Sequence, residues 1–183
     1  ADIKKLRGNL EMRGFATSCF ATAEEAARYL DGRPDGTSIG IGGSITAQQL
    51  GLDQLLPSHN SVYWHWLGGS SGQAAAADVY ISSVNGIAET GELVNIDGTG
   101  NRVASTIYGH KSLYLIVGVN KIAPTFEKAL WRARNIAAPK NAQRLGRKTP
   151  CAAKGDRCYD CESPDRICRA LTVLWARPTA IEY

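Results

Sequence analysis

The sequence of 183 residues has no long hydrophobic run, no internal repeat and no low-complexity tract. Its apolar stretches are far shorter than the roughly 20 residues that a helix needs to cross a bilayer, so we expect no membrane span. The Gly-rich turns lack the Gly-x-Gly-x-x-Gly spacing of dinucleotide-binding proteins, and no other NAD or flavin motif is apparent. An electron-carrying cofactor of that kind would therefore have to belong to a partner protein.

A secretory signal peptide is also not apparent, because the first residues are charged and helix-like rather than apolar. We therefore expect a cytoplasmic protein. The net charge is only +4, and the basic residues are dispersed or lie near the cysteines, which argues against nucleic-acid binding. The length and a hydrophobic content of 44% predict one globular domain spanning residues 1–183.

The order of the predicted elements favours an α/β fold with a mainly parallel sheet and flanking helices. Thr22, with Glu25 three residues later, has the pattern of a capping box and marks the start of a helix. In Trp64-His65-Trp66, the alternation of a strand would place the histidine opposite both indoles. The expected helices span residues 2–14, 22–31, 47–50 or beyond, 124–135 and 137–146. The expected strands span residues 15–20, 37–41, 61–66, 78–84, 113–119 and 171–175, and a further strand could begin at 179–183. The connection at 67–73 is flexible in composition.

A polar segment between the apolar runs Asp78–Val84 and Leu113–Val119 is the first candidate site. It has glycines at 86, 91, 98 and 100 with carboxylates and amides between them, which suggests a site built at strand ends rather than a plain hairpin. Glu89 and Glu92 are candidate general bases, since burial in a cleft tunes carboxylates. An elaborate structural hairpin is the alternative interpretation.

A second glycine-rich turn, Gly40–Thr46, leads from a predicted strand into a helix. Such a turn exposes backbone N–H groups at the positive end of the helix, an arrangement that binds anions. The alternative is a tight turn in which Ser44 or Thr46 caps the helix.

Four of the five cysteines have the spacing Cys-x6-Cys-x2-Cys-x6-Cys within residues 146–170, a predicted Cys-rich loop. Four thiols this close predict one tetrathiolate site, either a [4Fe–4S] cluster or zinc. The long arms around a single Cys-x-x-Cys pair favour the wider cluster, while disulfides, free thiols or a purely structural staple remain alternatives. Cys19, alone in an apolar context, is expected to be a small buried hydrophobe. The predicted ligands are Cys151, Cys158, Cys161 and Cys168.

Long motifs in the chain resemble the LUD-domain family, whose members are often called lactate utilisation proteins. The resemblance is carried by SSVNGIAETGELVNIDGTGNRVA and VGVNKI, and extends to IGIGGSITAQQLGL and TPCAAKGDRCYDCESPDRICR. It implies an α/β fold similar to ribose-5-phosphate isomerases and CoA transferases, and a link to lactate oxidation. The family usually has a longer helical connection at residues 67–76.

These observations predict a component of a microbial lactate (2-hydroxy acid) oxidation system that binds a small anion, carries an iron–sulfur cluster and acts with partner subunits, with a homo-oligomer also possible. One alternative is an isomerase-like or CoA-transferase-like enzyme, and another is a non-catalytic anion-binding subunit with structural zinc. The predicted ligand-binding residues are Gly42, Gly43, Ser44, Thr46, Ser83, Asn85, Asn95, Asp97, Gly98, Thr99, Gly100, Asn101, Arg102 and Lys121.

Overall fold

The computed structural model describes all residues from Ala1 to Tyr183, and the chain packs as two compact units. Each unit is assembled from separate stretches of the chain, so the units are not two consecutive domains. The expectation of one domain stays a prediction. Unit 1 comprises Ala1–Gly14, Val84–Val103 and Gly118–Ala176, and unit 2 comprises Phe15–Ser83, Ala104–Val117 and Arg177–Tyr183.

Unit 2 contains a four-stranded sheet in which every neighbouring pair is parallel, in the order β2-β1-β3-β6. Short helices connect the first three strands, as parallel neighbours require. This confirms the predicted α/β fold with a parallel sheet. The strands are β1 (Ser38–Ile41), β2 (Ser61–Trp64), β3 (Val79–Ser82) and β6 (Ser112–Leu115), and the helices are α2 (Ala23–Asp31), α3 (Ile45–Gln49), α4 (Leu52–Leu55), α5 (Ser71–Ala75) and the 3₁₀ turns η1 (Leu56–Ser58) and η2 (His65–Leu67).

Both faces of the unit 2 sheet are covered. Ile39 and Ile41 of β1 pack with the buried side chains of α2, α3 and α4 in one apolar cluster. Gly40, between them, faces the other way, where a Cβ atom would lie only 2.2 Å from the Ala74 carbonyl oxygen of α5. Glycine at this position therefore lets α5 lie directly against β1.

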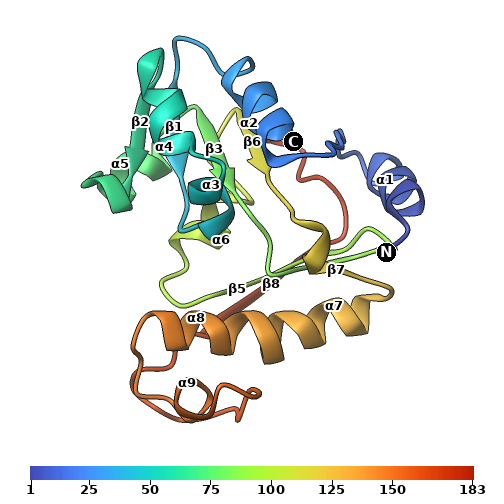
Figure 1. The fold of residues 1–183 in the computed structure, drawn as a ribbon, viewed down its shortest axis with the longest axis vertical. Helices are drawn as coiled ribbons and strands as arrows, with labels where there is room; N and C mark the ends of the chain where they lie inside the picture. Colours follow the sequence, from blue (N-terminus) through green and yellow to red (C-terminus); the bar gives the residue numbers. More distant parts are fainter. The chain divides into compact units, whose positions relative to one another are not determined.

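Unit 1 contains a mixed sheet in the order β7-β4-β5-β8, with α7 and α8 along one face (Figure 1). β5 runs antiparallel to both neighbours, whereas β4 and β7 are parallel. No helix of the protein has both the length and the apolar character needed to cross a bilayer. The elements are α1 (Ile3–Met12), β4 (Gly86–Ala88), β5 (Leu93–Asp97), η3 (Val119–Lys121), β7 (Ile122–Ala123), α7 (Phe126–Arg132), the π-helical turn η4 (Ala133–Ala137), α8 (Ala138–Arg144), α9 (Pro150–Lys154) and β8 (Ala170–Leu174), while α6 (Asn101–Ser105) begins in unit 1 and ends in unit 2.

Small residues bring α7 close to the sheet of unit 1. A Cβ atom on Gly86 would lie 2.5 Å from the Ala129 carbonyl oxygen of α7. Val94 of β5 packs against Ala129 and Ala133, which are fully buried. The opposite face of β5 carries Asn95, because side chains alternate along a strand.

One prediction about local structure is confirmed, and others are wrong. The Thr22–Glu25 capping box is present at the start of α2. Phe15–Phe20 is not a strand and has no regular structure, and the supposedly flexible connection at 67–73 contains the start of α5. Neither segment has the hydrophobic period that would identify its state.

The prediction for His65 is also wrong, because β2 ends at Trp64 and the chain turns into η2. The Trp64 and Trp66 rings stack at 4.9 Å, and the His65 ring lies edge-on to Trp66 at 5.6 Å. Cys19 is exposed rather than buried, because the segment around it forms no strand of the sheet.

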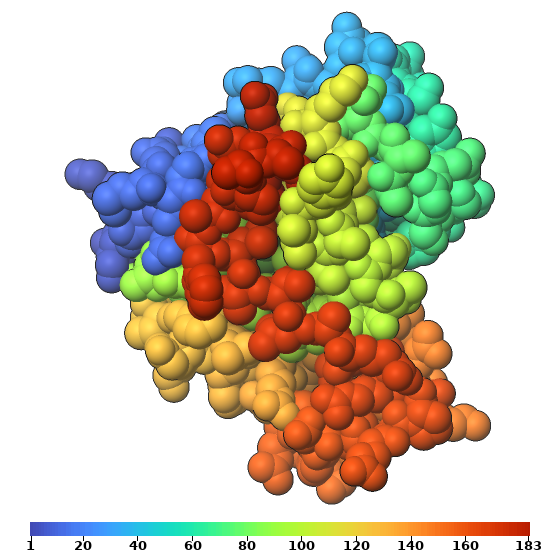
Figure 2. Space-filling model, turned by 180° about the vertical axis from the view of Figure 1, so that it is seen from behind, coloured from blue at the N-terminus to red at the C-terminus, as the bar shows by residue number.

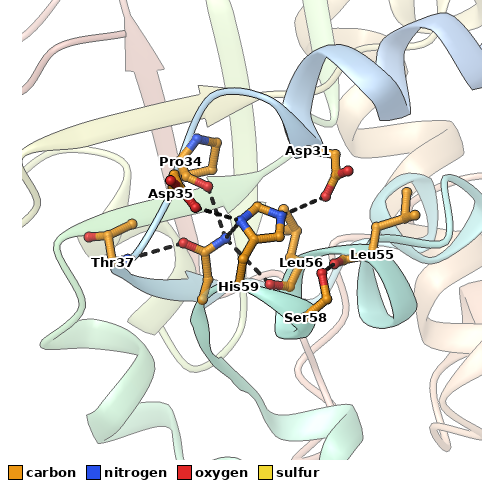
Figure 3. Close-up of polar contacts among 9 residues, drawn as sticks. Asp31, Pro34, Asp35, Thr37, Leu55, Leu56, Ser58 and His59 are labelled. Atoms are coloured by element: carbon orange, nitrogen blue, oxygen red, sulfur yellow. Dashed lines mark hydrogen bonds and ion pairs between the residues drawn. The ribbon is translucent and has the colours of Figure 1, made fainter.

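A histidine ties the end of α2 to the loop before β1 (Figure 3). His59 Nε2 lies 2.8 Å from Asp31 Oδ1, and Nδ1 lies 3.1 Å from Asp35 Oδ1. Hydrogen bonding to Asp31, together with the Asp35 carboxylate, raises the pKa of His59 above its ordinary value. The protonated ring can donate from both nitrogens, which the neutral ring cannot do.

We expect this contact to make the stability of the protein depend on pH. A histidine whose folded-state pKa is raised stabilises the fold fully below its unfolded pKa of about 6.5, and the stabilisation is lost as the pH rises through the folded value. The Tm of the wild type, measured between about pH 6 and pH 9, should therefore fall as the pH rises. The Tm of His59→Gln should not show this fall. His65→Gln is the matched control and should keep the decline; equal pH profiles for wild type and His59→Gln would contradict the assignment.

Candidate functional site

The four cysteines of the spaced motif line one hollow in unit 1. The segment that carries three of them runs from α9 to β8 and lies on the surface, orange to red in Figure 2. One wall comes from Ala138, Pro139 and Ala142 of α8. Cysteines separated by up to 17 positions in the sequence thus line the same hollow. The other lining residues are Arg134, Thr149, Cys151, Cys158, Cys161, Arg166, Ile167 and Cys168.

Local structure directs polar groups at two of the sulfurs. Thr149 caps α9 and its hydroxyl lies 3.3 Å from Cys151 Sγ. Asp160, inside the Cys-x-x-Cys turn, has a φ of 47° and is the only non-glycine residue with a positive φ. Its backbone N–H donates to Cys158 Sγ at 3.3 Å. The left-handed backbone of Asp160 therefore directs an amide donor at the Cys158 sulfur.

Two arginines supply positive charge beside the sulfurs. A hydrogen bond to the Cys158 sulfur is the main cause that raises the pKa of Arg134. The charge of Cys168 is the main cause that raises the pKa of Arg166. Both guanidinium groups also bind Asp160 Oδ1, at 3.2 and 2.9 Å. The hollow is therefore electrostatically suited to anionic sulfur.

Four free thiols are the donor set that a zinc ion or a [4Fe–4S] cluster would need. All four cysteines are half-buried and none forms a disulfide. Around a zinc ion with Zn–S bonds of about 2.3 Å the sulfurs would lie about 3.8 Å apart, but no three cysteine, histidine or carboxylate side chains are placed to hold an ion. The hollow among them has a volume of about 10 Å³, room for about one water molecule. Loading either centre therefore requires the thiol side chains to change their positions.

The polar segment forms a second cluster in unit 1, organised by the side chain of Arg102 at the start of α6. Its Nη1 donates to Asn95 Oδ1 at 2.7 Å, and its Nη2 donates to Asn85 Oδ1 at 3.1 Å and to the Ile96 carbonyl at 2.8 Å. Arg102 Nε lies 3.7 Å from Asp97 Oδ2, and both side chains are nearly buried. The predicted residues Asn85, Asn95, Asp97 and Arg102 are thus brought together.

Two further cations belong to this cluster. Arg132 of α7 donates to the backbone carbonyls of Asn85, at 2.5 Å, and of Asn120, at 2.9 Å. Burial, followed by repulsion from Arg132 and Arg102, lowers the pKa of Lys121 to about 8. Arg132 is not among the ligand-binding residues predicted from the sequence. Its bonds are to carbonyls distant in sequence, so periodicity and charge pattern carry no signal for them.

The loop at 97–101 is closed by its own aspartate. Asp97 Oδ1 accepts the backbone N–H of Thr99 and of Gly100, both at 3.1 Å, and Oδ2 accepts that of Val103. These amides are therefore directed at Asp97, and a role in holding a ligand stays a prediction. Gly98 packs against the Cys segment, and Asn101 opens α6.

The two predicted general bases bind elements of unit 1. Glu89 accepts the backbone N–H of Asp2 at 2.9 Å and lies 3.6 Å from Lys5 Nζ. Glu92 pairs with Arg13 Nη2 at 2.7 Å and also accepts the hydroxyl of Thr90. Both carboxylates hold α1 to the β4–β5 hairpin in this way, and their catalytic role stays a prediction.

The remaining predicted residues lie in unit 2. Ser44 caps α3 by accepting the Ala47 N–H at 3.1 Å, the role proposed as the alternative to anion binding. Gly42 donates to the Ile81 carbonyl at 2.9 Å and so extends the sheet. Ser83 donates to the Ile116 carbonyl. Gly43 borders the His65 ring, and Thr46 lies in the first turn of α3.

A family model described as the LUD domain matches residues 3–179 of this sequence. The chain belongs to the LUD-domain family. This is a family associated with lactate utilisation. The match spans both units and includes all four cysteines of the hollow.

A solved structure supports the fold of this LUD-domain protein. The crystal structure of a DUF162 family protein from Deinococcus radiodurans is similar, with a TM-score of 0.53 and 15% sequence identity. The similarity covers 98% of this chain and 93% of that chain. At this identity it shows the fold alone. The comparison with curated proteins found no match.

The contact between the loop and the Cys segment generates a stability prediction. A Cβ atom on Gly98 would lie 2.8 Å from the Ile167 carbonyl oxygen, next to Cys168. We expect Gly98→Ala to lower the free energy of unfolding by about 1–3 kcal/mol, because backbone on both sides must shift. Gly8→Ala, in open space on α1, is the control and should be neutral or stabilise by up to about 1 kcal/mol. Chemical denaturation measures both, and equal stability of the two variants would refute the close contact.

Proposed function

We propose that this LUD-domain protein is a component of a microbial lactate (2-hydroxy acid) oxidation system, that it carries a [4Fe–4S] cluster on Cys151, Cys158, Cys161 and Cys168, and that it binds a small anion. The observation that supports the proposal most directly is the convergence of four unpaired, half-buried thiols on one hollow. Zinc accepts the same donors, so the preference for the cluster rests on the long arms of the motif.

The residues around the hollow have distinct tasks in this proposal. Four thiolates carry a large negative charge, which Arg134 and Arg166 offset from beside the sulfurs. The Asp160 amide donates to Cys158 Sγ, and hydrogen bonds to cluster sulfurs are one determinant of a reduction potential. Arg166 also donates to the carbonyls of Cys161 and Cys168, at 2.9 and 3.0 Å, which fixes the backbone between two ligands.

A cluster of this type supplies one-electron transfer when bound. Removal of hydride or two electrons from a 2-hydroxy acid requires an acceptor, and the sequence has no nicotinamide or flavin motif. In this proposal the chain therefore relays electrons within an assembly and does not oxidise the substrate alone.

Metal analysis tests the proposal. Protein purified without oxygen should contain about four irons and four sulfides per chain, with a broad absorption band near roughly 400 nm that dithionite bleaches. Cys161→Ser should lose most of the iron and the band, because one of four ligands is removed. Cys19→Ser is the matched control, since Cys19 is exposed and does not line the hollow, and it should keep both.

Two results would contradict the cluster. One zinc per chain with no visible absorption would make the Cys segment a structural staple and would favour the non-catalytic anion-binding subunit. Metal-free protein with four titratable thiols would exclude both metal centres.

A further inference from the structure

We infer that Arg102, Lys121 and Arg132 of unit 1 form a binding site for a small oxyanion of the carboxylate or phosphate class. The inference deepens the anion binding in the proposed function and rests on that part of it, and it does not depend on the cysteines. It adds Arg132, which the sequence did not indicate, and excludes the loop amides at 99 and 100, which are occupied by Asp97.

Both guanidinium groups are anchored on the same residue. Asn85 accepts Arg102 Nη2 with its side-chain oxygen and Arg132 Nη1 with its backbone oxygen. The Asn85 N–H and its carboxamide also join β5, through the Val94 carbonyl and the Ile96 N–H. Asn85 therefore holds two cations from different helices near each other. Because both side chains are already fixed, a ligand would lose little binding free energy in ordering them.

Arg102 and Asp97 offset each other at this place, whereas Arg132 has no carboxylate partner. Asp97 is the carboxylate that contacts Arg102, and three of its contacts are with backbone N–H groups. Arg132 makes no ion pair, since both of its bonds are to neutral carbonyls. Lys121, desolvated beside two cations, lies in a positive potential that favours its neutral form. An anion bound here would restore the balance.

A donor next to Arg102 is unused as well. Asn95 is 1% exposed, its oxygen accepts from Arg102, and its Nδ2 has no hydrogen-bond partner. Thr172, opposite Asn95 on β8, has an unpartnered hydroxyl oxygen. Buried polar groups without partners are rare and mark places where a water or ligand completes the network.

The arrangement favours an oxyanion over a halide. A guanidinium group presents parallel N–H donors that match two oxygens of a carboxylate or phosphate, and an amide N–H adds a directed donor. A spherical anion uses this geometry poorly. The site therefore discriminates by shape as well as by charge.

Thermal unfolding in inorganic phosphate or sodium L-lactate, against sodium chloride at equal ionic strength, tests the inference. A specific ligand at about ten times its Kd should raise the Tm of the wild type by about 3–5 °C over chloride. Lys121→Met and Arg132→Gln should lose this shift. Lys128→Met, an exposed cation on the same helix α7, should keep it, and so should Cys161→Ser, which separates this test from the cluster.

The Lys121→Met variant distinguishes a binding residue from a structural one. Lys121→Met removes a cation that Arg102 and Arg132 repel, and it should lose the response to the anion whatever its own Tm in chloride. The inference is overturned if phosphate and lactate both leave the wild-type Tm unchanged, if all variants respond alike, or if Lys121→Met lowers the Tm in chloride and retains the response. A shift with phosphate alone assigns a phosphorylated ligand, and a shift with lactate alone assigns a carboxylate.

Discussion

The close contact of α7 with the sheet of unit 1 governs both candidate sites. It exists because Gly86 has no side chain and because Ala129 and Ala133 present only methyl groups to Val94 and Ala88. The helix backbone therefore reaches the strand, and close packing of this kind tolerates no added methylene without backbone movement. With α7 fixed at this distance, the Arg132 side chain meets the Asn85 carbonyl, and the helical run that continues through η4 delivers α8 to the wall of the cysteine hollow.

Arginines serve two different purposes along this same helical run. Arg134, in η4, lies with Cys158 and Asp160, where its charge meets negative partners. Arg132, two residues earlier, meets only neutral carbonyls and raises the potential around Lys121. A helix turns by about 100° per residue, so two residues separated by two positions, such as Arg132 and Arg134, point in clearly different directions. One basic stretch therefore supplies compensated charge to one site and uncompensated charge to another.

The sequence was sufficient where a local rule determines the structure. The Thr22–Glu25 capping box and the parallel sheet both agree with the pattern of the sequence. The sequence was insufficient where the structure of a segment depends on residues far away in the chain. Phe15–Phe20 has the composition of a strand but no place in either sheet, and the role of Arg132 depends on carbonyls 47 and 12 residues away. The sequence predicts one site for the whole polar segment. In the structure Glu89 and Glu92 contact α1 and Arg13, whereas Arg102 contacts Asn85 and Asn95.

The cations of the cluster repel one another, and this repulsion adds to burial in lowering the pKa of Lys121. Evolution readily replaces a desolvated, repelled lysine with an apolar side chain when only folding is at stake, because such replacements are often neutral or stabilising. Arg132 could be neutral without losing an ion pair, since it has none. A structural account explains Arg102, whose donors are used to join β5, Asn85 and α6. It does not explain why two further cations lie beside it with an unused amide donor at Asn95. Perturbed ionisable groups concentrate at binding sites, and for this reason we propose the cluster around Lys121 as one.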